Sequence, residues 1–120
     1  MTTAHTPTIL VVDDEPAIRD LLQEALEDQG YAVYVATNGR TALAALHEAL
    51  PDLVITDLMM PDIDGRALAA QMATDLHAAH IPIVLISAAY QPDPADHFMA
   101  TLRKPFDLTT LFAVVERCLP

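Results

Sequence analysis

Short apolar runs alternate along the chain with longer stretches in which apolar residues recur at helical spacing. Five such runs, several rich in β-branched residues, are predicted to be strands: Ile9–Val12, Val33–Ala36, Leu53–Thr56, Ile83–Ile86 and the weaker Met99–Leu102. Because the first, third and fourth show no polar alternation, they are typical of central strands buried on both faces of a parallel sheet. The second run is flanked by Tyr31 and is expected near an edge.

Helices are predicted between the strands. Pro16 suits the first turn of one helix and Gly30 its end, while Asn38, Asp64 and Asp107 can cap the starts of three others. Four sets of apolar residues have helical spacing: Ile18, Leu21, Leu22, Ala25 and Leu26; Ala42, Leu43, Leu46 and Leu50; Leu68, Met72 and Leu76; and Leu108, Leu111, Phe112, Val115 and Leu119. The residues of the last set are expected to face inward. This alternation predicts a three-layer α/β sandwich around a mostly parallel sheet.

The composition indicates one folded domain. Hydrophobic residues make up 52% of the 120 residues, which is enough for a core. A formal charge of −11 disfavours direct binding to nucleic acid. Residues 1–7 are expected to form a flexible tail before a domain over 8–120. They contain neither a basic start nor an apolar run, and no segment is suited to a membrane span, so neither export nor membrane insertion is indicated. The single Cys118 favours a reducing compartment, the cytoplasm.

Polar residues follow the predicted strands at the edge where parallel α/β sheets bind ligands. The first strand is followed by the acidic run Asp13 to Glu15, the third by Asp57 and the fourth by Ser87; Lys104 follows the weak fifth strand. An acid after a buried strand needs a compensating charge, and several carboxylates together suit Mg²⁺. An acidic run can also be a solvated helix start.

Lys104 is the one lysine in a chain that has Arg at its five other cationic positions. A compact ammonium fits beside a small phosphoryl group better than a flat guanidinium does. Chance retention of this lysine is the alternative.

Four motifs, in this order along the chain, resemble the receiver domain of two-component response regulators. They are Ile9–Pro16, Asp57–Gly65, Ser87-Ala88 and Lys104-Pro105-Phe106, and the similarity extends from Thr8 to Leu119. It implies a flavodoxin-like, doubly wound five-stranded parallel sheet with strand order 2-1-3-4-5.

The resemblance implies that Asp57 is the phosphoacceptor, attacking a phosphohistidine of a sensor histidine kinase or phosphotransfer protein. Asp13, Asp14, Asp57 and the backbone carbonyl of Met59 would hold Mg²⁺. Catalysis would then depend on positioning and electrostatics.

Other residues would contact the phosphoryl group or carry the switch. By similarity, Lys104 pairs with one phosphoryl oxygen, Ser87 donates a hydrogen bond to another, and Pro105 shapes the loop through a cis peptide bond. Thr101 stands where the family usually has an aromatic residue whose rotation reports phosphorylation. Tyr90 and Phe98 are either substitutes for that ring or ordinary packing residues.

The interval from Ser87 to Lys104 is 17 positions, about five short of the usual interval, which is more than one helical turn of about 3.6 residues. Asp93 and Pro94 can start a helix there, but only one or two turns fit, and Pro92 cannot lie inside it. A shortened fourth helix is therefore expected. Because the family commonly dimerises through that region, a monomer or weak dimer is expected.

The function predicted is that of a phosphorylation-switched signalling module with an unknown protein target or output domain, and not of an enzyme acting on an external substrate. One alternative is a receiver-like interaction module that works without phosphorylation. Another is a Mg²⁺-dependent phosphohydrolase with an aspartyl-phosphate intermediate. Such enzymes have an Asp-x-Asp motif after the first strand, but the second position after Asp13 is Glu15 in this chain. His77 and His80 are three positions apart, but no further His or Cys accompanies them at metal-ligand spacing, which disfavours a zinc site.

Overall fold

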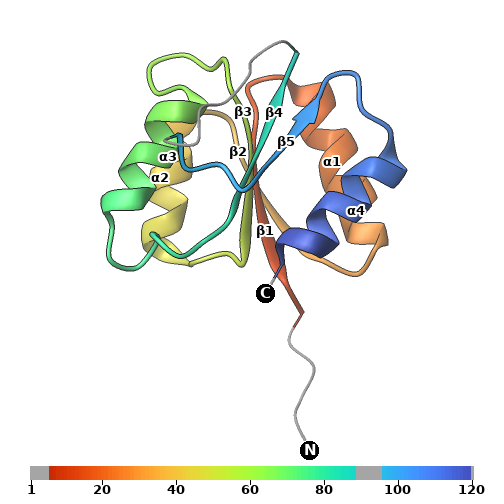
Figure 1. The fold of residues 1–120 in the computed structure, drawn as a ribbon, viewed down its shortest axis with the longest axis horizontal. Helices are drawn as coiled ribbons and strands as arrows, with labels where there is room; N and C mark the ends of the chain where they lie inside the picture. The colour runs from red at the N-terminus through yellow and green to blue at the C-terminus, as the bar shows by residue number, and fades with distance from the viewer. Residues whose placement is uncertain (1–5, 89–95, 120) are drawn as a thin grey trace, which may run out of the picture.

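The computed structural model describes residues 6–88 and 96–119, in which five parallel strands form one sheet in the order β2-β1-β3-β4-β5 (Figure 1). The strands are β1 (Thr8–Val12), β2 (Ala32–Ala36), β3 (Leu53–Asp57), β4 (Ile83–Ser87) and β5 (Ala100–Arg103). The predicted strand order is confirmed. The run beside Tyr31 is the edge strand β2, in which Tyr34 is 54% exposed.

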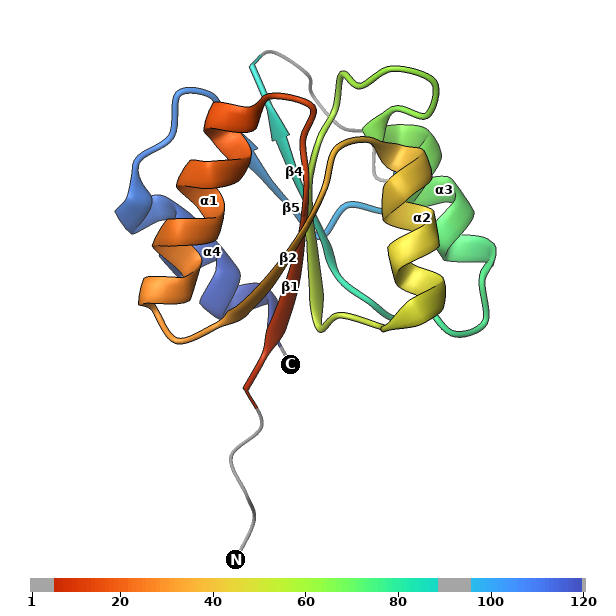
Figure 2. The same ribbon diagram turned by 180° about the vertical axis from the view of Figure 1, so that it is seen from behind.

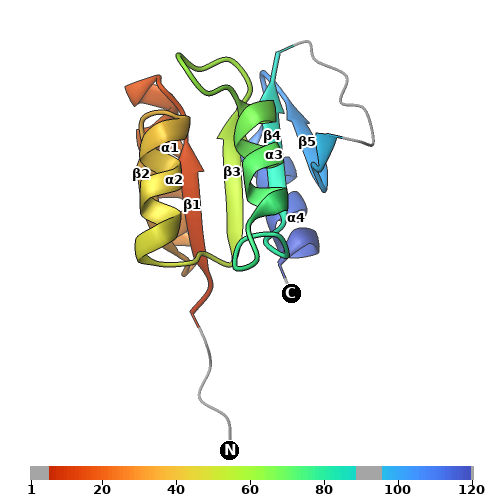
Figure 3. The same cartoon turned by 90° about the vertical axis from the view of Figure 1, so that its left-hand side faces the viewer.

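Helices cover both faces of the sheet, as Figures 1 and 2 show, so the three-layer architecture is confirmed. They are α1 (Pro16–Asp28), α2 (Gly39–Glu48), α3 (Gly65–Thr74) and α4 (Leu108–Cys118). α1 and α4 lie on one face, and α2 and α3 on the other (Figure 3). Ile9 and Val11 of β1 pack toward the first pair, whereas Leu10 and Val12 pack toward the second, which explains the lack of polar alternation in this strand.

Side-chain caps start three of the helices at the predicted residues. Asn38 accepts a hydrogen bond from the Thr41 backbone N–H at 2.9 Å, and the Thr41 hydroxyl lies 3.2 Å from the Asn38 N–H in a reciprocal capping box. Asp64 caps α3 and Asp107 caps α4, each accepting from the N–H three residues later.

Two helices end earlier than their apolar spacing predicts. Leu50 lies beyond the end of α2 and is 47% exposed. The helix does not continue through Leu50, because the following Pro51 disfavours helical backbone in the residue before it. Leu76 lies beyond the end of α3 and is 94% exposed. Here the Asp75 carboxylate accepts from the His77 N–H at 2.7 Å, which favours a turn over another helical turn.

The inner face of α4 also differs from the prediction. Leu108 is the first residue of this helix and is 40% exposed, so its expected inward position was wrong. Leu111 and Val115 are buried as expected, together with Val114 and Cys118, while Phe112 and Leu119 are partly buried against the same core. Leu21 belongs to the apolar spacing of α1, yet its side chain is 45% exposed.

The short helix expected from Asp93 and Pro94 falls outside the described residues, as do Tyr90 and most of the expected N-terminal tail. Within 6–88 and 96–119, no helix combines the length and apolar character needed to cross a membrane.

Candidate functional site

The register of the parallel strands brings the predicted site residues to one edge of the sheet. Asp57 and Ser87 are the last residues of β3 and β4, and Asp13 directly follows β1. Lys104 follows β5, and its backbone N–H donates to the Ser87 carbonyl at 2.9 Å. These strand ends meet around a depression of about 540 Å³, lined by Asp14, Glu15, Asp57, Leu58, Met59, Ser87, Ala88 and Lys104.

Three carboxylates share this edge. One oxygen from each of Asp13, Asp14 and Asp57 lies within 4.8 Å of the others. Asp13 is 1% and Asp57 7% exposed, whereas Asp14 is exposed. The Lys104 Nζ lies 3.3 Å from Asp57 Oδ1 and 3.8 Å from Asp13 Oδ2, so one ammonium faces both buried acids.

The buried acids are incompletely compensated. Burial raises the pKa of Asp57, against the lowering effect of Lys104. Burial also raises the pKa of Asp13, where the Glu15 N–H opposes the shift and the charge of Asp57 adds to it. Asp13 Oδ2 is buried and has no hydrogen-bond partner among the described residues. A hard divalent cation supplies the compensation that such an oxygen set lacks.

A family model for the response regulator receiver domain matches residues 9–116. The chain belongs to the response regulator receiver family. It is similar to the chemotaxis protein CheY4 of Vibrio cholerae, with a TM-score of 0.91 and 30% identity, covering 96% of this chain and all of that one.

Curated relatives of different kinds are similar to this chain over part of their length. The chain is 36% identical over 121 residues to RpaA of Synechocystis, a DNA-binding transcriptional regulator, covering 94% of this chain and 49% of RpaA. It is 38% identical over 117 residues to the sensor histidine kinase TmoS of Ectopseudomonas mendocina, covering 92% of this chain and 12% of TmoS. The chain thus spans half or less of these two relatives.

The residues of the expected switch lie along β5 and the loop after it. Thr101 of this receiver domain is exposed on β5, and Phe98 is partly buried against the core beneath α2 and α3, which favours its interpretation as a packing residue. The Lys104–Pro105 peptide bond is cis, as the resemblance implied. The Met59 side chain is 74% exposed on the loop after β3, beside Asp57.

Two contributors to the site were missed in the sequence. A Cβ on Gly65 would lie 2.6 Å from the Asp57 backbone oxygen, so α3 can start this close to β3 only with glycine. The Arg19 Nη1 donates to the Asp13 carbonyl at 2.8 Å. The sequence held a signal for Gly65, because this glycine directly follows the predicted helix cap Asp64. It held no signal for the contact of the long Arg19 side chain with the backbone.

Proposed function

We propose that this receiver domain accepts a phosphoryl group on Asp57 from the phosphohistidine of a sensor histidine kinase or phosphotransfer protein. In the reaction, a carboxylate oxygen of Asp57 forms a bond to phosphorus, the phosphorus–nitrogen bond breaks, and the histidine nitrogen leaves with the electron pair. The observation that supports this most is a buried carboxylate at an open depression, with Lys104 Nζ 3.3 Å away.

Mg²⁺ fits the residues present, because Asp13 Oδ2 is a buried oxygen without a hydrogen-bond partner among the described residues, and Asp13, Asp14 and Asp57 each bring one carboxylate oxygen within 4.8 Å of the others. Asp13, Asp14 and Asp57 would hold the ion, with the Met59 carbonyl as a fourth ligand. When bound, Mg²⁺ neutralises charge on the phosphoryl oxygens. Lys104 then moves its pairing from the free carboxylate to a phosphoryl oxygen.

Ser87 is suited to the read-out, since it ends β4 at the same depression. In the proposal its hydroxyl donates to a phosphoryl oxygen and draws the loop after β4 toward the site. Thr101 has no ring to rotate, so the signal would pass through this loop to a protein partner. The formal charge of −11 supports a protein target over direct contact with nucleic acid. We propose that the domain acts in the cytoplasm as a monomer or weak dimer.

A module that works without phosphorylation is the second candidate, and exposed Thr101 favours it because no ring is available at that position to report a phosphoryl group. The two candidates differ in whether Asp57 takes up phosphate. A phosphohydrolase would instead release many equivalents of phosphate per chain.

The proposal is tested by intact mass after incubation with acetyl phosphate and Mg²⁺. We expect one phosphoryl group, labile in alkali, on the wild type and on Asp62→Asn, which removes an exposed aspartate of the same loop. We expect none on Asp57→Asn or in the presence of a chelator. Wild-type protein that binds Mg²⁺ yet gains no mass, from acetyl phosphate or from a kinase, would support the module that works without phosphorylation.

A further inference from the structure

Three of the four hydrogen-bonding groups of Asp13 are engaged by its own chain. Its N–H donates to the Ala36 carbonyl at 3.2 Å, its Oδ1 accepts from the Glu15 N–H at 2.9 Å, and its carbonyl accepts from Arg19 Nη1 at 2.8 Å. Its Oδ2 is buried and has no hydrogen-bond partner in the described residues, with the Lys104 Nζ 3.8 Å away. Of the two carboxylate oxygens of Asp13, only Oδ2 is therefore left without a hydrogen bond from the described residues.

The Arg19 contact acts on two acids at once. The carbonyl that it holds belongs to the peptide bond joining Asp13 to Asp14, and a peptide group is planar. Fixing this oxygen therefore fixes the direction in which the chain leaves Asp13 and enters Asp14. Asp14 is exposed, so the backbone has a large share in orienting its carboxylate.

The segment that carries these acids is short, and its helix start adds no side-chain cap. Only residues 13–15 join β1 to α1, and the N-cap residue Glu15 makes no side-chain cap hydrogen bond. Pro16, at the helix start, has no N–H to donate. Because the carboxylates of the cluster repel one another, each contact that holds the backbone of this segment opposes their moving apart.

We propose that Arg19 is a positioning residue for Mg²⁺ binding: by holding the Asp13 carbonyl, it keeps the Asp13 and Asp14 carboxylates in place for the ion. This inference rests on the proposed function. It concerns the apparent affinity for Mg²⁺ and assigns Arg19 no contact with the ion or the phosphoryl group.

A positioning role and a simple charge effect of Arg19 predict opposite changes in Mg²⁺ affinity when this residue is replaced by alanine. The positive charge of Arg19 lies near the site and repels a cation, so if charge alone mattered, Arg19→Ala would bind Mg²⁺ more tightly. Positioning predicts weaker binding, by roughly tenfold, as is typical when a group that orients a metal ligand is removed. Arg19→Lys keeps the charge and an N–H donor on a differently shaped head group, and should recover part of the affinity.

The experiment is a Mg²⁺ titration by isothermal calorimetry, with backbone amide NMR shifts as a second readout, at a temperature where each variant is folded. Arg117→Ala is the matched control, since it removes one exposed arginine from the last turn of α4. We expect wild-type affinity for Arg117→Ala, a roughly tenfold higher Kd for Arg19→Ala and an intermediate value for Arg19→Lys. With acetyl phosphate, the half-saturating Mg²⁺ concentration of Arg19→Ala should rise while the rate at saturating Mg²⁺ stays near that of the wild type.

Equal or tighter Mg²⁺ binding by Arg19→Ala would overturn the inference and leave the proposed function intact. An unchanged half-saturating Mg²⁺ concentration with a lower maximal rate would overturn it as well. If the wild type does not bind Mg²⁺, the metal-dependent function itself fails, and the role of Arg19 fails with it.

Discussion

At the amino edge of the sheet, Asp52 and Asp75 accept hydrogen bonds from backbone N–H groups, whereas at the carboxyl edge Asp13, Asp14 and Asp57 face one another. Asp52 accepts from the Thr8 N–H at 2.8 Å, and the hydrogen bond from the His77 N–H lowers the pKa of Asp75. At the opposite edge, burial raises the pKa of Asp13 and Asp57. Asp52 and Asp75 therefore stabilise the chain where they lie, whereas the charges of Asp13 and Asp57 are buried at a cost in stability.

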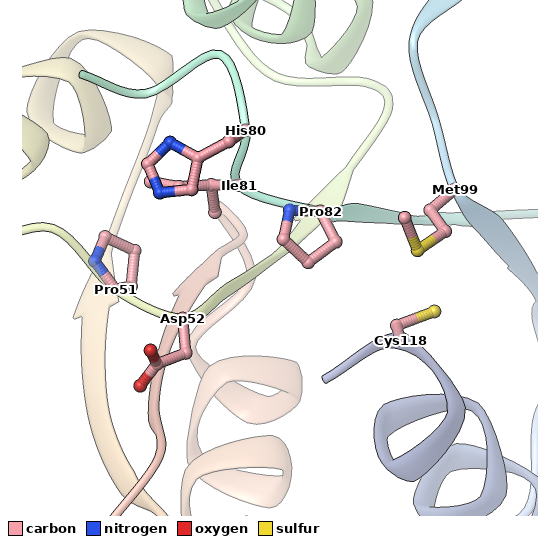
Figure 4. Close-up of a pocket in the computed structure, with 7 residues that line it drawn as sticks. All are labelled: Pro51, Asp52, His80, Ile81, Pro82, Met99 and Cys118. Carbon is pink, nitrogen blue, oxygen red and sulfur yellow. The ribbon is translucent and has the colours of Figure 1, made fainter. Parts of the chain in front are cut away.

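A hollow alone does not distinguish the two edges. The amino edge also has one, of about 290 Å³, lined by residues before β3, β4 and β5 and by the end of α4 (Figure 4). Its lining is mainly apolar, including Ile81, Met99 and Cys118, and the Asp52 carboxylate there already accepts a backbone hydrogen bond. The incompletely compensated acids, more than the cavity, mark the carboxyl edge as the functional one.

The largest effect is expected from Gly65→Ala, which disturbs the carboxyl edge through the backbone. The added Cβ would lie 2.6 Å from the Asp57 carbonyl oxygen and 3.1 Å from Leu58 Cα. We expect a loss of about 1–3 kcal/mol in the free energy of unfolding, measured with denaturant, together with weaker Mg²⁺ binding. Gly30→Ala is the control: Gly30 has φ +95° and open space around it, so the variant should lose stability through backbone strain but keep its Mg²⁺ affinity. Unchanged stability in Gly65→Ala would refute the close contact.

Mg²⁺ should stabilise the carboxyl edge selectively. At a concentration about ten times its Kd, the ion should raise the free energy of unfolding of the wild type by about 1.4 kcal/mol, which a thermal melt detects as a higher Tm. Asp13→Asn should lose most of this gain, since it neutralises a ligand of the cluster. The same Mg²⁺-dependent rise in Asp13→Asn would place the ion elsewhere.

Neutralising one aspartate at each edge should shift stability in opposite directions. Asp57→Asn should raise the free energy of unfolding by about 1 kcal/mol, because the raised pKa shows that burial outweighs the attraction of Lys104. Asp52→Ala should lower it by about 1 kcal/mol, since the Thr8 N–H loses its acceptor. Chemical denaturation of both variants without Mg²⁺ is the measurement. Shifts of the same sign would contradict the contrast between the edges.

The smallest effect is the pH dependence of the metal-free protein. Because the pKa values of Asp13 and Asp57 are raised, the folded state binds more protons than the unfolded state above 3.8, so stability should rise as the pH falls from neutral through their folded values. The lowered pKa values of Asp75 and Asp107 act oppositely: their contribution is present above 3.8 and is lost as the pH falls through their folded values. Thermal melts should therefore show Tm rising as the pH falls from neutral through the folded pKa values of Asp13 and Asp57, and Asp57→Asn should show a smaller rise.

Much of the fold could be predicted from the sequence because its signals are local. Uninterrupted apolar runs marked the inner strands, and Asn38, Asp64 and Asp107 proved to be the caps. The errors at Leu50 and Leu76 arose where apolar spacing continued past a helix end that other forces set. In the first case Pro51 stops the helix, and in the second the Asp75 side chain does.

The candidate site could be predicted as a set of residues, because parallel strands deliver their carboxyl ends to one edge. The contacts that hold it could not. The donation from Arg19 to the Asp13 carbonyl depends on the path of a long side chain, and the need for glycine at Gly65 depends on the distance between α3 and β3. The arginine contact leaves no pattern in the sequence, and the position of Gly65 after a helix cap does not by itself give the distance to β3.

The central claim is that Asp57, and not the neighbouring Asp13 or Asp14, receives the phosphoryl group. The most direct measurement treats protein phosphorylated with acetyl phosphate and Mg²⁺ with borohydride, which reduces an aspartyl phosphate to homoserine, and then sequences the peptides by mass spectrometry. The account predicts homoserine at position 57 alone, and none in protein that was not phosphorylated. Homoserine at position 13 or 14, or a phosphorylated protein without homoserine at position 57, would contradict it.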